Sequence, residues 1–597
     1  MSEKNAGGSF KTSFSAFNEK ICFSKEISSI GTVGRVRLLK GGAAKFLNFI
    51  GRSFAYASTR TYGCFMLSFG LVSLFLQFAE FYFKSEQGDA FSNIIISAVI
   101  ALIGIPLLII DRPICIVAQD FFVTDYLFFE FLSIKRMQAN VNHPSIKILG
   151  GIFLGFIPAV VSFFVPIHYV VITLFLIAVT TVAFTTPEFP MVLTILVLPY
   201  VSLISYSEIV LVCLCAVTFL SYALKVILGK RVYNFCIYDI FVCLLAFFAF
   251  IGGFFGAGED SLRNALILIA LLLIYFPANN LIVNRRLADL LINTFVISSI
   301  PVTVISIVEF IVENVNPKAV VPQYSTPGMS AFFSTPEALS AFLLVSSVFA
   351  LTHAVEKRRP WKKTLYFAVF GLEAVALGLT MQPFVWIAML LSFPAYSIIT
   401  SRKIPMDALV LLMALPLVLF ALPVGSLDAV YKFLKISPDF SGIIAGYSES
   451  MNIFFENLWL GIGIGDASYS AVSGASSGGM FNMLLGVATE LGIFALILLV
   501  SMILMLLRQL SYYRRFMTNS NFITVKDMSA LAVTVFMIYS VGANVFEDIA
   551  IICLFFIMFG ICSSVMRSAR KEHDDRLGYY GDSSSSESSV IDVDIRR

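Results

Sequence analysis

Charged residues are scarce in this chain. Lys, Arg, Asp and Glu make up 13% of its 597 residues, whereas an average soluble protein has about 25%. Apolar residues make up 58%, and 59 of these are Phe. So few charges cannot cover the surface of a soluble protein of this size. The composition therefore excludes a cytosolic enzyme, a disordered chain and a nucleic-acid binder, and it indicates a polytopic membrane protein.

The sequence also lacks the patterns of common metal and nucleotide sites. It has no Walker A or HExxH motif, and its four His are scattered rather than clustered. Its nine Cys lie in apolar segments or in the N-terminal arm, so no disulfide framework or CxxC site is predicted. The Gly-Ile-Gly-Ile-Gly run at 461–465 does not match the GxGxxG nucleotide fingerprint. We therefore expect no metal, no cofactor and no nucleic-acid partner.

Long apolar runs are abundant. A helix needs about 20 apolar residues to cross a bilayer, and sixteen runs qualify, give or take two. They lie at 61–83, 91–110, 148–165, 168–184, 190–206, 209–228, 236–254, 263–283, 288–312, 337–355, 364–380, 383–400, 405–424, 480–507, 528–545 and 549–567. The segment 114–133 carries three acids among aromatics, which favours an interfacial helix. We predict an all-α polytopic integral membrane helical bundle with about 14–16 transmembrane helices.

The positive charges predict the orientation. Residues 1–60 hold ten Lys or Arg against three acids, which indicates a basic cytosolic arm, and we expect no removable signal peptide. Six further basic clusters between the spans and one after the last span fall on the same side if the spans alternate. The N- and C-termini are then cytosolic, the tail 568–597 is predicted to be disordered, and the loop 425–479 lies outside.

The outer loop 425–479 has a composition that favours order. Apolar and polar residues alternate at helical spacing over 448–459, which predicts a helix on the outer membrane interface. The loop then runs into Gly461, Gly463 and Gly465, whose backbone can approach a ligand or a neighbouring helix closely.

Four short segments within about 332–510 match, in order and in spacing, the pieces of a known sequence pattern. They are Phe333-Ser334-Thr335-Pro336-Glu337, Leu379-Thr380, Ser441-Gly442 with Leu460-Gly461-Ile462-Gly463, and the run from Asn482 to Ile493 that contains Glu490-Leu491-Gly492. This set resembles the F-x-N-P-N, L-T-x-S-R, S-G-R…L-G-x-G and H-N-x-x-L-x-x-x-x-E-L-G-I pieces of the O-antigen ligase and polymerase superfamily (WaaL/Wzy-like). The resemblance covers about a third of the chain and implies a membrane glycosyltransferase.

The departures from this family pattern concern the cationic residues. Pro383 and Ile443 stand where the family usually has Arg, and Phe481 stands where it has His. In the family these residues are thought to bind the diphosphate and to assist proton removal from the acceptor. A departing diphosphate still needs positive charge, and an acceptor hydroxyl benefits from a positioned base.

Other residues on the outer side are candidates for these roles. For the diphosphate we consider Lys432, Lys435 and Arg263, although headgroup contacts and helix anchoring are simpler explanations for them. For catalysis we consider Glu490, Asn482 and Glu456. Acids inside the bilayer deserve separate consideration because their burial is costly. They are Glu309, Glu337, Glu373 and Glu490, and for Glu490 a structural hydrogen bond is an alternative role.

The resemblance implies transfer or polymerisation of glycan from a polyprenyl-diphosphate carrier on the outer face of a bacterial cytoplasmic membrane, for the cell envelope. Its partners would be that lipid-linked glycan, a glycan or lipid acceptor, membrane lipid and polysaccharide assembly proteins. Two alternatives remain open: a catalytically silent relative that scaffolds polysaccharide assembly, and a polysaccharide or lipid transporter. The predicted parts are the arm 1–60, N-terminal spans 61–331, the ligase-like core 332–510, C-terminal spans 511–567 and the tail 568–597.

Overall fold

A computed structural model describes most of the chain between residues 57 and 576. The described residues are 57–83, 88–121, 124–125, 147–165, 167–204, 206–227, 231, 233–281, 285–315, 330–356, 360–380, 382–400, 440–465, 472, 482–514 and 520–576. Nearly all of them are helical, and none of them forms a strand. The chain divides into two compact units, residues 1–190 with 220–233 and residues 191–219 with 234–597.

Fifteen of the sixteen predicted spans coincide with helices, and the sixteenth, 405–424, lies outside the described residues. Nine helices of the described part are long and apolar enough to cross a membrane, and five shorter apolar helices accompany them. This confirms the predicted all-α polytopic membrane bundle.

The first unit contains α4 (Thr59–Phe83), α5 (Gly88–Ile109), α6 (Ile114–Asp120), α8 (Ile148–Phe164) and α9 (Ile167–Thr185). Small residues let α4, α5 and α8 approach closely. A Cβ on Gly63 would lie 2.9 Å from the Gly104 carbonyl oxygen, and one on Gly155 would lie 2.4 Å from a carbonyl oxygen of α4. Ser73 and Ser162 share a hydrogen bond of 2.8 Å within this buried contact. Close packing and buried hydroxyls thus hold the three helices together.

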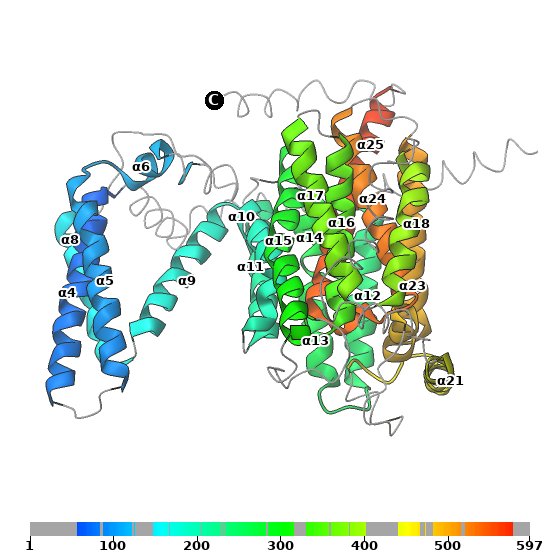
Figure 1. Cartoon of the computed structure of the whole chain (residues 1–597), viewed down its shortest axis with the longest axis horizontal. Coiled ribbons are helices and arrows are strands. Elements are labelled where there is room, and N and C mark those ends of the chain that lie inside the picture. Colours follow the sequence, from blue (N-terminus) through cyan, green and yellow to red (C-terminus); the bar gives the residue numbers. More distant parts are fainter. Residues whose placement is uncertain are drawn as a thin grey trace, which may run out of the picture. The chain divides into compact units, whose positions relative to one another are not determined.

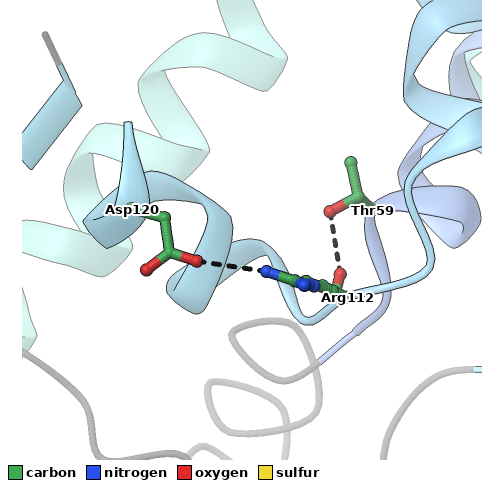
Figure 2. A network of polar contacts seen from close by, with 3 residues as sticks. All are labelled: Thr59, Arg112 and Asp120. Carbon is green, nitrogen blue, oxygen red and sulfur yellow. Dashed lines mark hydrogen bonds and ion pairs between the residues drawn. The ribbon is translucent and has the colours of Figure 1, made fainter. Parts of the chain in front are cut away.

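A small polar network connects the beginning of α4 with residues around α6 (Figure 2). The Thr59 hydroxyl donates to the Arg112 carbonyl at 2.8 Å, and the Arg112 guanidinium donates to Asp120 at 3.4 Å. The network joins the beginning of α4 to α6, which is the first part of the predicted interfacial segment 114–133. Residues 126–133 of that segment lie outside the described residues.

Two helices cross between the units, α10 (Glu188–Val197) and α11 (Ser207–Ile227). The second unit continues with η2 (Leu198–Leu203), α12 (Ile237–Phe254), α13 (Ser261–Leu272), α14 (Tyr275–Leu281), α15 (Arg285–Val315), α16 (Pro336–Glu356), α17 (Pro360–Leu379), α18 (Pro383–Thr400), α21 (Phe440–Glu456), α23 (Met483–Arg514), α24 (Ser520–Ser540), η3 (Val545–Glu547) and α25 (Ile549–Arg576).

Three predicted spans are broken rather than continuous. The span 263–283 is interrupted between α13 and α14, where Pro277 has no N–H to donate to the carbonyl of Leu273. The span 190–206 tightens into the 3₁₀ helix η2 around Pro199. The third break lies inside α23, where Gly492 has φ 80° and ψ 179°. This third break has the largest consequence for the candidate site.

The second unit is a bundle with two distinct ends (Figure 1). One end gathers the α12–α13 corner, the start of α16, residues 457–465 and the turn between α24 and α25. We call it the outer end, after the predicted orientation. The opposite end, which we call the inner end, holds the start of α12 and Arg567 of α25. The Arg567 guanidinium donates there to the carbonyl of Asn234, which precedes α12.

Helix α21 differs in direction from the rest of the second unit. Figure 1 shows it almost end-on beside α23, while α16, α18 and α23 run along the bundle. Its Tyr447 hydroxyl donates to the Val541 carbonyl at 3.0 Å. A helix therefore covers most of the segment 448–459, as predicted, but it begins at Phe440 and ends at Glu456. Residues 457–460 form a turn instead, which leads the chain toward the break in α23.

Candidate functional site

The break in α23 exchanges helical hydrogen bonds for bonds to a neighbouring segment. In a regular helix the Ile493 N–H would bond to the Thr489 carbonyl. Here Ile493 donates to the Leu458 carbonyl at 2.9 Å, and Ile462 donates to Thr489 at 2.9 Å. The next free carbonyl, that of Glu490, accepts from Gly463 at 3.1 Å. The turn after α21 thus replaces the missing turn of α23, and all these backbone groups are satisfied.

The same segment is also bonded to the α12–α13 corner. The Ala257 N–H donates to the Ile462 carbonyl at 2.8 Å, and the Ile464 N–H donates to the Ser261 hydroxyl at 3.1 Å. The Asn264 amide donates to the Ile464 carbonyl at 3.0 Å. We name this assembly the glycine junction: residues 458–465, the break at 489–493 and the corner 256–264. It joins α12, α13, α21 and α23 at the outer end.

The three predicted loop glycines are needed for this docking. Gly461, Gly463 and Gly465 have φ of 71°, 98° and 108°, a region that favours glycine. A Cβ on Gly461 would lie 2.4 Å from the Glu490 backbone, and one on Gly463 would lie 2.7 Å from the Gly256 Cα. Of the two partners that the sequence allowed for this segment, a ligand or a helix, the structure places helix backbones against it.

The Glu490 side chain lies at this junction. Its Oε1 accepts a hydrogen bond from the Gly465 N–H at 3.1 Å, and the side chain is half-buried. Asn482 stands eight residues earlier, about 12 Å along the helix. There its side-chain oxygen accepts the Leu484 N–H at 2.8 Å and caps the start of α23. Glu490 thus lies beside the docked segment 458–465, whereas Asn482 lies at the start of α23, about two turns before Glu490.

The remaining predicted catalytic residue, Glu456, is the last residue of α21 and is exposed. Two of the three predicted diphosphate ligands, Lys432 and Lys435, lie outside the described residues. The third, Arg263, stands in the first turn of α13, next to Asn264 of the junction. Among the described residues, no group of three or more His, Cys, Asp or Glu is arranged to hold a metal ion.

Arg263 forms an ion pair with Glu208. Its Nη2 lies 2.6 Å from the Glu208 Oε2, and the two side chains are 62% and 39% exposed. An exposed pair of this kind is worth only about 0–1 kcal/mol. The Arg263 guanidinium can therefore exchange Glu208 for another anion at small cost.

The other family-like segments also meet at the outer end. Ser334 donates its hydroxyl to Asp548 at 2.6 Å, ahead of α25. The Gln382 amide, at the start of α18, donates to Glu337 at 2.8 Å. One turn deeper, Ser340 of α16 donates to Thr380 at 2.9 Å. The segments 333–337 and 379–380 are therefore neighbours in space, although more than 40 residues separate them in sequence.

An open pocket of about 180 Å³ lies near these contacts. Its lining includes Glu208, Ser334, Glu547 and Asp548 from the starts of α11, α16 and α25. Carboxylate and hydroxyl oxygens accept hydrogen bonds from hydroxyl groups. The pocket thus presents, at the outer end, oxygen acceptors suited to a polyhydroxylated molecule.

A second polar cluster lies at the inner end, and the sequence alone did not reveal it. The buried Asp239 accepts hydrogen bonds from the Cys236 N–H, the Tyr275 hydroxyl and the Asn279 amide at 3.0–3.1 Å. The Arg567 guanidinium also donates to Asn279. Tyr275 and Asn279 belong to α14, and Arg567 belongs to α25, so only the three-dimensional structure brings them together around Asp239. Each of these groups has a partner, which indicates a structural role.

A comparison with models of known protein families finds no match for this chain, and a comparison with curated proteins finds none either. The fold itself defines the class: an all-α, multi-pass helical membrane protein.

Proposed function

We propose that this protein transfers or polymerises glycan from a polyprenyl-diphosphate carrier on the outer face of the cytoplasmic membrane. The observation that carries the proposal is the glycine junction, because the segments that resemble L-G-x-G and E-L-G-I dock on each other there through backbone hydrogen bonds. Helix α21, which differs in direction from the other helices of the bundle, is followed in the chain by the residues of the same junction. Supporting features are the acceptor oxygens of the pocket and the exposed Arg263.

The chemistry assigns a role to each of these groups. The acceptor oxygen forms a bond to the anomeric carbon while the bond from that carbon to the diphosphate oxygen breaks. The acceptor proton passes to a base, for which we propose Glu490, and the diphosphate leaves on its carrier. Arg263, released from Glu208, would balance the negative charge that develops on the diphosphate. Lys432 and Lys435 are further candidates for this second role.

A specific observation favours the alternative of a catalytically silent scaffold. Arg263 is already paired with a carboxylate, and Glu490 already accepts a hydrogen bond from the Gly465 backbone. Both residues therefore have structural partners at the outer end. A scaffold would keep the junction as an assembly surface without using either residue in a reaction.

Surface polysaccharide in the source cells tests the proposal. Deletion of the protein should remove a surface glycan, or shorten it, and should leave its lipid-linked precursor to accumulate. Complementation with the unaltered chain should restore the glycan, whereas the Lys432/Lys435 double substitution to Met should restore it only in part. An unchanged precursor pool after deletion would contradict a transferase, and full restoration by a Glu490→Gln chain would favour the scaffold.

The proposed orientation makes a separate prediction. At the outer end the described loops carry Glu259 and Asp260, and at the inner end α17 begins with Lys362 and Lys363, as expected if the inner end faces the cytosol. In intact cells, a membrane-impermeant thiol reagent should modify Glu259→Cys and not Lys363→Cys, relative to the unsubstituted chain. The reverse pattern would place the glycine junction in the cytosol. Equal labelling in permeabilised cells is the control for thiol reactivity.

A further inference from the structure

Glu373 is an acid that the proposed transfer reaction does not use. It lies in α17, and its side chain is fully buried where α17 packs against α15 and α16. Two serine hydroxyls from those helices reach the same carboxyl oxygen. Ser299 of α15 lies 2.5 Å and Ser346 of α16 lies 2.6 Å from Glu373 Oε1. The other oxygen, Oε2, has no hydrogen-bond partner among the described residues.

This cluster is the middle layer of a polar seam between α16 and α17. Thr380, Glu373 and Tyr366 follow each other at intervals of seven residues, about 10 Å apart along the helix. Thr380 pairs with Ser340 at 2.9 Å, Glu373 pairs with Ser346, and the ring of Tyr366 lies 5.0 Å from the ring of His353. The seven-residue spacing places all three layers on one face of the helix pair. Glu373 is the acid of the central layer.

Among the described residues of the helices that pack around it, no positively charged side chain lies at the level of Glu373. The closest titratable groups along its own and the two adjoining helices are Tyr366, His353, Asp289, Glu309, Glu337 and Lys363, each at least seven residues from the cluster member on its helix. Helix α18, which also touches α17, has one titratable side chain in its length, Tyr396. An ionised Glu373 would therefore be a buried anion with one oxygen that accepts no hydrogen bond, and such a state is strongly unfavourable.

A neutral acid fits the same atoms without that cost. The Glu373 O–H donates to the Ser299 hydroxyl oxygen, and the Ser299 O–H donates to the Val296 carbonyl, which lies 2.8 Å away. The Ser346 O–H donates to Glu373 Oε1 at 2.6 Å. Each of the three protons then has an acceptor, and the one group left without a partner is a neutral carbonyl oxygen.

We propose that Glu373, with Ser299 and Ser346, is a proton-binding site inside the helical bundle that holds its proton at neutral pH and ties α15, α16 and α17 together. Release of the proton would leave a bare anion between the three helices. They would then have to separate or to admit water, so proton binding and helix packing are linked at this site. This inference rests on the Glu373 contacts alone and does not depend on the proposed transferase function.

Infrared difference spectroscopy of the full chain in lipid vesicles tests the site. The difference spectrum between the unaltered protein and Glu373→Gln at pH 7 should contain the C=O band of a neutral carboxylic acid. Gln is the matched replacement, because an amide NH2 at the Oε1 position can donate to the hydroxyl oxygens of Ser299 and Ser346. The serine protons then have the Val296 carbonyl and the Ser299 oxygen as acceptors, each at 2.8 Å. We expect it to fold as the unaltered chain does. The control is the same subtraction with Glu337→Gln, an acid of the outer end that is only half-buried.

Three results would overturn the proposal. Carboxylate bands at pH 7 in the Glu373→Gln difference spectrum would show an ionised acid. A shift from acid to carboxylate bands when sodium chloride replaces choline chloride would show that the site binds a cation instead. An acid band that the Glu373→Gln substitution does not remove would belong to another residue. Ser299→Ala removes the acceptor of the Glu373 proton and should weaken proton binding. The acid band should then give way to carboxylate bands at a proton concentration at least tenfold higher, that is at a lower pH, than in the unaltered chain. An identical titration would contradict the role of Ser299 as acceptor.

Discussion

Replacing Glu490 by Gln should lower glycan transfer by 10²-fold or more while leaving the fold intact. The Gln side chain keeps an oxygen that can accept the Gly465 N–H, so the glycine junction should stay docked. It cannot take up a proton, and loss of a positioned general base typically costs 10²–10⁴-fold in rate. The measurement is the rate of transfer in vesicles together with the thermal unfolding midpoint of the same preparation.

The matched control is Glu259→Gln, an exposed acid on the α12–α13 corner at the same end of the bundle. It should change neither the rate nor the midpoint. If Glu490→Gln transfers glycan at the unaltered rate, Glu490 has a structural role and is not the base. If the rate and the midpoint fall together, the side chain acts through the stability of the junction.

Replacing Gly492 by Ala should destabilise the second unit by about 2–6 kcal/mol. Its backbone conformation, φ 80° with ψ 179°, lies in a region that is essentially confined to glycine and costs an L-residue about 1–3 kcal/mol. The added Cβ would lie 2.2 Å from the Trp459 carbonyl oxygen, and overpacking of this kind costs a further 1–3 kcal/mol. We expect a lower unfolding midpoint, and faster proteolysis of the 458–465 segment.

Gly486→Ala is the comparison for this effect. Gly486 lies in the same helix, and the nearest atom to its added Cβ would be the Asn544 side-chain oxygen at 3.2 Å, which a small side-chain movement relieves. It should cost less than about 1 kcal/mol. Equal midpoints for the Gly492 and Gly486 variants would show that the break in α23 is not held by the docked segment.

The helices could be predicted from the sequence because hydrophobic length is a local property. Fifteen spans were located in this way, yet the breaks at Gly492 and between α13 and α14 were not. A break depends on whether another segment can replace the lost hydrogen bonds. Leu458 does so for Ile493 from 35 residues earlier in the chain, and Ile462 does so for Thr489 from 27 residues earlier. Apolar composition does not contain that information.

The site was predictable in part for the same reason. The positive-φ glycines of 461–465 were recognisable by residue type, but a glycine permits close approach of a ligand and of a helix equally well. The pairing of Arg263 with Glu208 joins residues 55 positions apart, and the sequence gives no local signal for it. Glu373 was recognisable as an intramembrane acid, whereas its two serine partners required the packing of α15, α16 and α17.

The central claim, transfer of glycan from a lipid carrier, is tested most directly with purified protein in vesicles. The vesicles would contain polyprenyl-diphosphate-linked glycan extracted from the source cells, together with an acceptor fraction from the same cells. The account predicts that glycan moves to the acceptor, that free carrier diphosphate appears in equal amount, and that Glu490→Gln vesicles show at most a hundredth of this rate. Carrier-linked glycan that stays intact at the level of protein-free vesicles, with correctly folded protein present, would contradict it.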